Sequence, residues 1–370
     1  MKRITLILPD LIAGGAQRIV LNLAKGFIEN NYQVDLLLLT NKGNFFGKIP
    51  VKVKLLRLRN NLDLSYFISL PLSGFKFIRY LHKNSPDILI SSLTGTNLFI
   101  LALRKLSGIK IPLIVIEHSV LKNVKCKIIK LMIKRIYPLA DKIVCVSEGI
   151  QSDLLSLGIE KNKLVTINNP IDIEYVLRQS ILDCPHPWIQ NKTTPVVLAV
   201  GRLVEAKGFD VLLQAFSQVL KNTSSRLIIL GEGPLRERLV DLSKRLEISQ
   251  HIDFVGYVDN PYSYIKQSDV FVLSSKWEGF VGVLLEAMAL GTSVVATNCW
   301  ASPSEILKNG QIGKLVPAND PSLLAEAIIS TLLNPQNRVE LMTRASEFKI
   351  ENIVKKYVDL INLNIKARIE

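Results

Sequence analysis

The chain has 370 residues, more than one hydrophobic core usually serves, and this length predicts two domains. Its composition, 48% hydrophobic and 21% charged, is that of a globular protein. No apolar run approaches the roughly 20 residues of a membrane-spanning helix, and the short run at residues 4–8 is interrupted too early to be an export signal. We therefore expect a cytoplasmic protein.

The sequence does not indicate metal-dependent chemistry. The four cysteines lack metal-ligand spacing and are expected to be free cytosolic thiols; they are Cys126, Cys145, Cys184 and Cys299. There is no Asp-x-Asp triplet, no Walker loop and no nucleophile elbow. We predict neither a metal nor a cofactor.

The net charge of +14 comes from one half of the chain. Residues 1–180 hold 26 Lys and Arg against 12 Asp and Glu, whereas residues 181–370 hold 20 of each kind. This asymmetry predicts an anionic partner for the first half, either a nucleic acid or a membrane surface.

The first half alternates apolar runs with segments of helical spacing. Continuous apolar runs are typical of strands buried on both faces. The predicted strands are residues 4–8, 34–39, 88–91, 111–116 and 142–146. The alternation predicts a parallel sheet with helices on both faces.

Two features at the ends of these strands are candidate ligand contacts. Gly14 and Gly15 lie between the first strand and a helix, where they would let a phosphate or sugar approach the backbone, although a plain tight turn has the same pattern. His118 follows the strand at residues 111–116 and is expected near the ligand crevice of a parallel sheet. A hydrogen-bonded loop histidine is the alternative.

Two helices of this half are suited to a membrane surface. In residues 121–137, Lys127, Lys130 and Lys134 are expected on one face, opposite Ile129, Met132, Ile133 and Ile136. Residues 75–83 repeat the pattern with Lys76, Arg79 and Lys83. Each basic residue near an anionic leaflet contributes roughly 1 kcal/mol, so several could hold the protein peripherally at the membrane. The alternative is an ordinary amphipathic helix packed on its own sheet.

Residues 176–195 contain three prolines and little periodicity, and we place an interdomain linker there. A second alternating half follows, with strands expected at residues 196–200, 227–230, 252–255, 270–273 and 293–297. Arg202 and Lys207 follow the first of these strands and precede a helix, which predicts a diphosphate site, with solvated surface charge as the alternative.

We expect the chemistry to centre on residues 276–291, a strand–loop–helix passage. Gly279 and Gly282 would admit a ligand close to the backbone, and the N–H groups of the helix start favour anions and hydroxyl oxygens. Glu278 precedes the helix and Glu286 lies inside it, so separate hydrogen bonds to one polyol ligand are more plausible than an acid/base pair. A solvated surface loop is the alternative. Further along, Ser302 and Glu305 match a capping box.

The order and spacing of these motifs resemble the retaining glycosyltransferases of family 4 over essentially the whole chain. The motifs that carry the resemblance are Gly14-Gly15-Ala16-x-Arg18, Asn169-Pro170-Ile171-Asp172, Gly201-Arg202-Leu203 with Lys207-Gly208, Gly231-Glu232-Gly233-Pro234, and Glu278-x7-Glu286. The resemblance implies an α/β fold of type B, with two Rossmann-like domains facing across a cleft. It places the acceptor domain at residues 1–175, the nucleotide-sugar domain at 196–348, and a last helix at 349–370 that returns to the first domain.

The resemblance also implies roles for individual residues. Arg202 and Lys207 would hold the donor diphosphate, Glu278 would bind the transferred sugar, and His118 would lie near the reacting sugar. The other expected substrate contacts are Gly14, Gly15, Asn169, Gly201, Gly233, Tyr257, Gly279, Phe280, Val281 and Glu286, the last of these on the ribose. No general base is assigned, because the family has no firmly established enzymic nucleophile and a leaving-phosphate oxygen is thought to take the acceptor proton.

These expectations define a retaining, metal-independent hexosyl- or N-acetylhexosaminyl-transferase. It would move sugar from a UDP-sugar to a lipid-linked saccharide in cell-surface glycan synthesis, docked on an anionic membrane by its basic half. Rival hypotheses are a nucleotide-sugar 2-epimerase of the same architecture, an inactive saccharide-binding relative and a basic nucleic-acid-binding protein. The sequence departs from the family pattern at Gln17, at Val281 and at residues 300–303.

Overall fold

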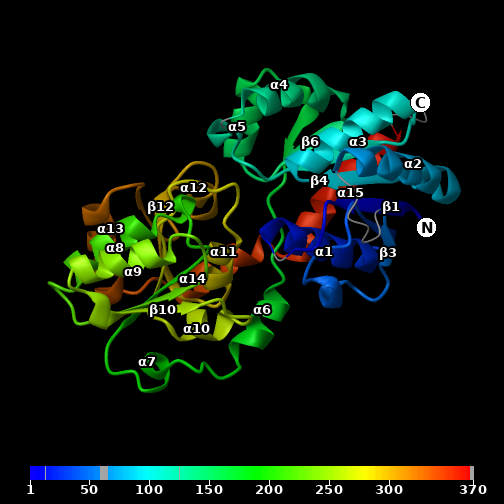
Figure 1. Ribbon diagram of the computed structural model, residues 1–370. Coiled ribbons are helices and arrows are strands. Elements are labelled where there is room, and N and C mark those ends of the chain that lie inside the picture. Colours follow the sequence, from blue (N-terminus) through cyan, green and yellow to red (C-terminus); the bar gives the residue numbers. More distant parts are fainter. Residues whose placement is uncertain (13, 59–65, 125, 367–370) are drawn as a thin grey trace. The chain divides into compact units, whose positions relative to one another are not determined.

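The computed structural model describes residues 1–12, 14–58, 66–124 and 126–366, so Lys125, which falls within the helix predicted at residues 121–137, lies outside it. The chain divides into two compact units (Figure 1). The N-terminal unit comprises Met1–Pro170 and Ile350–Glu370, and the C-terminal unit comprises Ile171–Lys349.

The N-terminal unit is built on a seven-stranded parallel sheet of order β3-β2-β1-β4-β5-β6-β7. Its strands are β1 (Arg3–Leu8), β2 (Gln33–Leu38), β3 (Lys54–Arg57), β4 (Ile88–Ser92), β5 (Leu113–Glu117), β6 (Lys142–Cys145) and β7 (Leu164–Thr166). Its helices are α1 (Gly15–Glu29), α2 (Tyr66–Asn84), α3 (Thr94–Ser107), α4 (Lys127–Ile136), α5 (Glu148–Ser156) and α15 (Ile350–Lys366). β4 and β5 are buried along their whole length, as their continuous apolar runs predicted.

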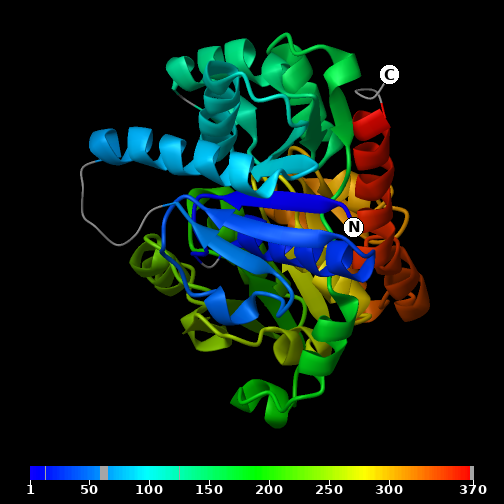
Figure 2. The same ribbon diagram turned by 90° about the vertical axis from the view of Figure 1, so that its right-hand side faces the viewer.

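The last helix closes the N-terminal unit. Figures 1 and 2 show α15, in red, beside α1, and Phe27 of α1 packs edge-on against Tyr357 of α15 with ring centroids 6.2 Å apart. Gly26 permits the approach, because a Cβ there would lie 2.5 Å from Val354 Cγ2. This return of the C-terminal helix is the one that the family resemblance implied.

The C-terminal unit has a six-stranded parallel sheet of order β10-β9-β8-β11-β12-β13. Its strands are β8 (Val196–Val200), β9 (Arg226–Leu230), β10 (Ile252–Gly256), β11 (Val270–Leu273), β12 (Ser293–Asn298) and β13 (Lys314–Pro317). Its helices are α6 (Ile173–Ser180), α7 (Pro187–Gln190), α8 (Phe209–Val219), α9 (Arg236–Arg245), α10 (Tyr262–Gln267), α11 (Gly282–Ala289), α12 (Pro303–Ile306), α13 (Pro321–Leu333) and α14 (Arg338–Ser346). Two parallel Rossmann-like sheets confirm the predicted fold class.

The segment expected to be a linker, residues 176–195, belongs to the C-terminal unit instead. α6 and α7 lie within or at the edge of it, and Val176, Cys184 and Ile189 are buried in the core of that unit. The prolines suggested a flexible connection, but Pro187 opens α7 at its first turn, a position that tolerates the missing N–H.

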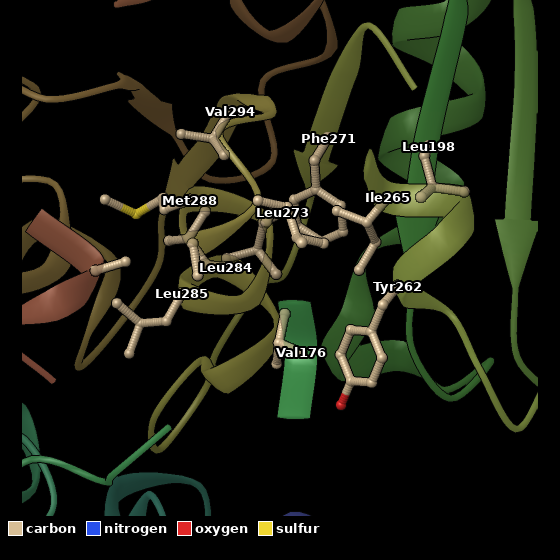
Figure 3. Close-up of a cluster of buried hydrophobic side chains, with 14 of the residues drawn as sticks. Val176, Leu198, Tyr262, Ile265, Phe271, Leu273, Leu284, Leu285, Met288 and Val294 are labelled. Atoms are coloured by element: carbon tan, nitrogen blue, oxygen red, sulfur yellow. The ribbon is translucent and has the colours of Figure 1, made fainter. Parts of the chain in front are cut away.

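The helix that follows β11 is held by the main core of the C-terminal unit. Figure 3 shows Leu284, Leu285 and Met288 of α11 beside Leu273 of β11 and Val176 of α6. All three α11 side chains are buried. Truncating one of them to alanine would cost about 2–5 kcal/mol, so α11 is a rigid support for the loop at its start.

The two helices predicted to face a membrane differ in how they pack. α2 buries Phe77, Tyr80 and Leu81 in the N-terminal core, which favours the alternative of an ordinary amphipathic helix for residues 75–83. α4 is far more exposed, since Ile128, Leu131 and Met132 all face solvent. Within the described residues, no helix combines the length and apolar character needed to cross a membrane.

Candidate active site

The candidate site lies where two loops leave the C-terminal sheet. β8 and β11 are neighbours, yet the chain runs from β8 to β9 on the other side of β8. Such a switch in strand order opens a crevice at the carboxyl ends of parallel strands, where α/β proteins bind ligands. Residues 201–207 follow β8 and residues 274–281 follow β11. The fold therefore brings together the two loops that the sequence singled out.

Lys207 and Glu278 meet between these loops. The Lys207 ammonium donates to Oε1 of Glu278, and the two side chains are 20% and 14% exposed. Ser275 Oγ donates to the same carboxylate oxygen over 2.7 Å. The pair keeps both charges compensated in a poorly solvated position. A phosphate entering this position finds a cation already in place, and a sugar hydroxyl finds an acceptor.

Backbone contacts fix the position of Lys207. Ser274 Oγ donates to the Lys207 carbonyl over 2.9 Å, and Lys276 N–H donates to the Ala206 carbonyl over 2.7 Å. Gly208 has a φ of 60°, and a Cβ there would lie 2.1 Å from the Ser274 carbonyl oxygen. Only glycine fits this approach, so the Lys207-Gly208 pattern is explained by how the two loops pack.

The loop after β8 also interlocks with the loop after β9. Leu203 N–H donates to the Glu232 carbonyl over 2.9 Å, and Leu235 N–H donates to the Leu203 carbonyl over 3.0 Å. A Cβ on Gly233 would lie 2.5 Å from the Leu203 carbonyl oxygen, and one on Gly201 would lie 3.1 Å from Lys207 Cε. Packing alone therefore requires glycine at 233, whatever its role toward a ligand.

Arg202 and Tyr257 are exposed side chains at the carboxyl edge of the sheet. Within the part of the chain that the structure describes, Arg202 has no ion-pair partner, so its guanidinium is available to an anion. Tyr257 follows β10, two strands from β8, and is 66% exposed. It therefore lies farther along this edge than the Lys207–Glu278 pair.

The segment at residues 298–302 supports the loop from Glu278 to Val281. Glu278 N–H donates to the Trp300 carbonyl over 3.3 Å, and Val281 N–H donates to Ser302 Oγ over 3.1 Å. The predicted capping box is wrong for this reason, since Ser302 makes no side-chain cap to α12. Ala301 has a φ of 105°, in the region that favours glycine. Phe280, partly buried, packs near Phe348 with ring centroids 6.2 Å apart.

Glu286 lies on α11, where its Oε1 accepts a hydrogen bond from the Tyr262 hydroxyl over 3.2 Å. Tyr262 is itself buried at the start of α10. Gly282, the first residue of α11, is different from the packed glycines, because a Cβ there would meet nothing within 4 Å. Packing within the protein would therefore tolerate another small residue at position 282.

The buried thiol beside this site is not suited to nucleophilic chemistry. Burial and the charge of Glu278 raise the pKa of Cys299 to about 12. The thiol therefore stays protonated near neutral pH. Among the described residues, no group of three or more His, Cys, Asp or Glu side chains is placed to hold a metal ion.

The remaining predicted site residues lie in the N-terminal unit, at the carboxyl ends of its strands. Gly14 precedes α1 with an extended backbone, and a Cβ on Gly15 would meet nothing within 4 Å. Asn169 follows β7; it is 5% exposed, and its Oδ1 has no hydrogen-bond partner among the described residues. An unsatisfied buried amide oxygen costs about 1–3 kcal/mol and is a candidate ligand contact.

His118 is held by the residue before it. The carboxylate of Glu117, fully buried, accepts hydrogen bonds from the His118 N–H over 3.0 Å and the Ser119 N–H over 2.8 Å. Thr94 Oγ1 and the Tyr137 hydroxyl also donate to it. Burial raises the pKa of Glu117 despite these donors. The Glu117 network therefore fixes the backbone from which the imidazole projects.

The imidazole of His118 is neutral near pH 7. Burial lowers the pKa of His118 to about 4. Its Nε2 is enclosed and has no hydrogen-bond partner within the described part of the chain. A neutral ring nitrogen without a partner can bond a sugar hydroxyl without carrying charge.

Comparison with known proteins identifies the family. Residues 186–348 match the family described as "Glycosyl transferases group 1", and residues 13–175 match "Glycosyltransferase Family 4". The chain belongs to glycosyltransferase family 4. The two matches divide at the middle of the chain and include the Lys207–Glu278 site and the His118 loop respectively.

Relatives of this family 4 chain cover it end to end. It is 27% identical to an N-acetylgalactosamine-N,N'-diacetylbacillosaminyl-diphospho-undecaprenol 4-alpha-N-acetylgalactosaminyltransferase of Campylobacter jejuni, over 97% of this chain and 100% of the relative. Among solved structures, a glycosyltransferase of Rickettsia africae matches with a TM-score of 0.82 and 18% identity, covering 99% of both chains. Anabaena HepE in complex with UDP-glucose matches with a TM-score of 0.78 and 18% identity over 98% and 100% of the chains. The structural likeness confirms the type B glycosyltransferase fold.

Several supporting residues were missed by sequence reasoning. Ser275 lies two residues past the end of β11 and could have been found by the same signal as His118, its place just past a strand end. Tyr262 and Ser302 carry no such signal, because their contacts to Glu286 and Val281 join segments about 20 residues apart.

Proposed function

We propose that this chain is a retaining glycosyltransferase that moves a hexose or N-acetylhexosamine from a UDP-sugar to a lipid-linked saccharide in cell-surface glycan synthesis. The observation that carries the proposal is the Lys207–Glu278 pair at the strand-order switch of the C-terminal sheet, on the loop that also carries the exposed Arg202. A cation for a diphosphate and a carboxylate for a hydroxylated ring lie side by side there.

In the proposed reaction, Arg202 and Lys207 bind the donor diphosphate. As the bond from the sugar C1 to the diphosphate breaks, negative charge grows on the leaving phosphate oxygen and positive charge spreads over C1 and the ring oxygen. Two preorganised cations stabilise the leaving group without a metal. The acceptor hydroxyl forms its bond to C1 on the face that the diphosphate leaves, and its proton goes to a leaving-phosphate oxygen.

Other residues of the site would position the donor. Glu278 accepts hydrogen bonds from the transferred sugar, together with the backbone from Gly279 to Val281. Glu286 accepts from the ribose hydroxyls, with Tyr262 holding its carboxylate in place. In the N-terminal unit, the neutral His118 and the unsatisfied Asn169 amide oxygen are proposed contacts of the transferred sugar or acceptor.

The donor and acceptor classes rest on the relatives. The Campylobacter jejuni relative is named for transfer of N-acetylgalactosamine to a diphospho-undecaprenol-linked saccharide, and HepE was solved with UDP-glucose. These names support a UDP-sugar donor and a lipid-linked acceptor for this chain. A lipid-linked acceptor in turn favours a cytoplasmic protein that works at the inner membrane face.

The experiment is a panel of nucleotide sugars incubated with the purified protein, with and without a bacterial lipid extract. Released nucleotide and lipid-borne sugar are both measured. We expect one UDP-sugar to give nucleotide release that depends on the extract, with equal sugar appearing in lipid. Consumption of the sugar nucleotide without any acceptor would instead indicate an epimerase or hydrolase, and absence of UDP binding would reject the site.

A further inference from the structure

α4 exposes most of its apolar side chains to solvent. Ile128 is 68% exposed, Leu131 54% and Met132 40%, whereas Ile133 is fully buried. The helix contacts the rest of the N-terminal unit mainly at α3 and at the turn Tyr137–Leu139, and Figure 1 shows it at the outer edge of that unit. Single exposed apolar residues are ordinary, but three on one face of one short helix mark an interaction surface.

The exposed side chains form one stripe. Ile128, Leu131, Met132 and Arg135 are spaced at i, i+3, i+4 and i+7, so they lie on one face, away from the buried Ile133. Lys127, Lys130 and Lys134 run along the flank of this stripe. The sequence-based grouping of Met132 with Ile133 is therefore wrong, because a helical repeat does not say which side of the helix its neighbours cover.

The charges on α4 select the partner. Its ten residues contain four cations and no acidic residue. A cationic or neutral apolar partner would leave those charges unmatched, whereas a surface of phosphate groups above hydrocarbon matches both the lysine flank and the apolar stripe. A nucleic acid would bind the lysines but would leave the apolar side chains of Ile128 and Leu131 exposed to water.

We propose that α4 docks this protein on an anionic lipid bilayer, with Ile128, Leu131 and Met132 inserted below the headgroups and the flanking lysines bound to lipid phosphates. A helix of ten residues is about 15 Å long and cannot span a hydrocarbon core of about 30 Å, so it lies in the plane of the interface. The inference deepens the proposed function, since it gives the surface on which a lipid-linked acceptor is met, but it rests on α4 alone.

Co-sedimentation with vesicles tests the docking surface. The probes are phosphatidylcholine vesicles and vesicles in which about a third of the lipid is phosphatidylglycerol, at low and high salt. We expect binding only to the anionic vesicles. Lys127→Gln, Lys130→Gln and Lys134→Gln together should lower the partition coefficient about a hundredfold, from about fivefold per charge. Leu131→Ser should lower it about tenfold.

Matched controls separate docking from general surface effects. Leu106→Ser changes an 84% exposed leucine on α3 of the same unit, and Lys105→Gln removes a charge beside it. Both should bind vesicles as the wild type does. The proposal would be overturned if the controls lost as much vesicle binding as the α4 variants. It would also be overturned if the α4 variants bound vesicles as the wild type does.

Insertion is measured separately with Met132→Trp. The indole that this variant adds should shift its emission to the blue on anionic vesicles and be quenched by lipids labelled in the upper acyl chain. Unchanged emission would contradict a lipid partner. So would a protein that does not bind vesicles but is retained on a duplex oligonucleotide through the same lysines. UDP binding, measured by calorimetry without vesicles, tests the proposed function independently, so either idea can fail while the other stands.

Discussion

Substitutions in the Lys207–Glu278 pair should change the rate of sugar transfer and the unfolding free energy by different amounts, so the two effects can be measured separately. Lys207→Met removes the cation that faces the diphosphate in our proposal. A unit charge about 4 Å from a phosphate oxygen contributes about 4 kcal/mol at an effective dielectric constant of about 20, which corresponds to about a thousandfold in kcat/KM. The variant should also lose about 3 kcal/mol of unfolding free energy, because the Ser275 hydroxyl is then the one partner that the Glu278 carboxylate keeps among the described residues.

The second change, Lys207→Met with Glu278→Gln, removes both charges. Stability should recover by most of the amount lost, since no buried charge remains unpaired, while transfer should stay at least as slow. Lys192→Met is the control; it breaks the exposed Lys192–Asp269 pair at the amino end of the sheet and should change stability by under about 1 kcal/mol and activity not at all. Urea unfolding and initial rates of nucleotide release measure the two effects. Activity restored in the double variant, or unaffected in Lys207→Met, would refute the assignment of Lys207.

Three further predictions follow from local geometry. Gly282→Ala should not lower the unfolding free energy, because its Cβ has open space and alanine favours a helix more than glycine does. It should nevertheless raise the donor KM about tenfold if a sugar approaches the backbone there, and unchanged kinetics would remove Gly282 from the site. Ala301→Gly should raise the unfolding free energy by about 1 kcal/mol by relieving its positive φ, and a lower melting temperature would show that the backbone is not strained. Because burial lowers the pKa of His118 to about 4, its neutral form contributes stability above pH 6.5 that is lost as the pH falls toward 4. Wild-type unfolding free energy should therefore drop more than that of His118→Gln over this range, by up to about 3 kcal/mol, and parallel curves for the two proteins would contradict a buried neutral ring.

The sequence predicted the central strands of both sheets, because strands buried on both faces have continuous apolar runs. The edge strands β3, β7 and β13 lack such runs and were not predicted. It also singled out the loops at residues 201–207 and 276–291, but it did not predict the strand order that brings them to one edge of the sheet. Arg202, Lys207, Glu278 and Glu286 were singled out from residue type, from position and from the family resemblance, and their ligand roles stay predictions.

What the sequence did not predict depends on contacts between distant segments. The pairing of Lys207 with Glu278 joins residues far apart in the chain, and each could equally have been solvated. Ser302 matched a capping box by spacing, but its hydroxyl is taken by Val281 N–H, a competing donor that no local pattern reveals. α4 shows the same limit, since periodicity defines faces but tertiary packing decides which face is covered.

The most direct test of the central claim is the stereochemical course of the reaction. The protein is incubated with the UDP-α-sugar that the donor panel selects and with the bacterial lipid extract, and the C1 configuration of the lipid-borne sugar is read by proton NMR alongside released UDP. We expect an α-linked product in equal amount to UDP, and neither without the extract. A β-linked product, or UDP released without acceptor, would contradict retaining transfer at the Lys207–Glu278 site.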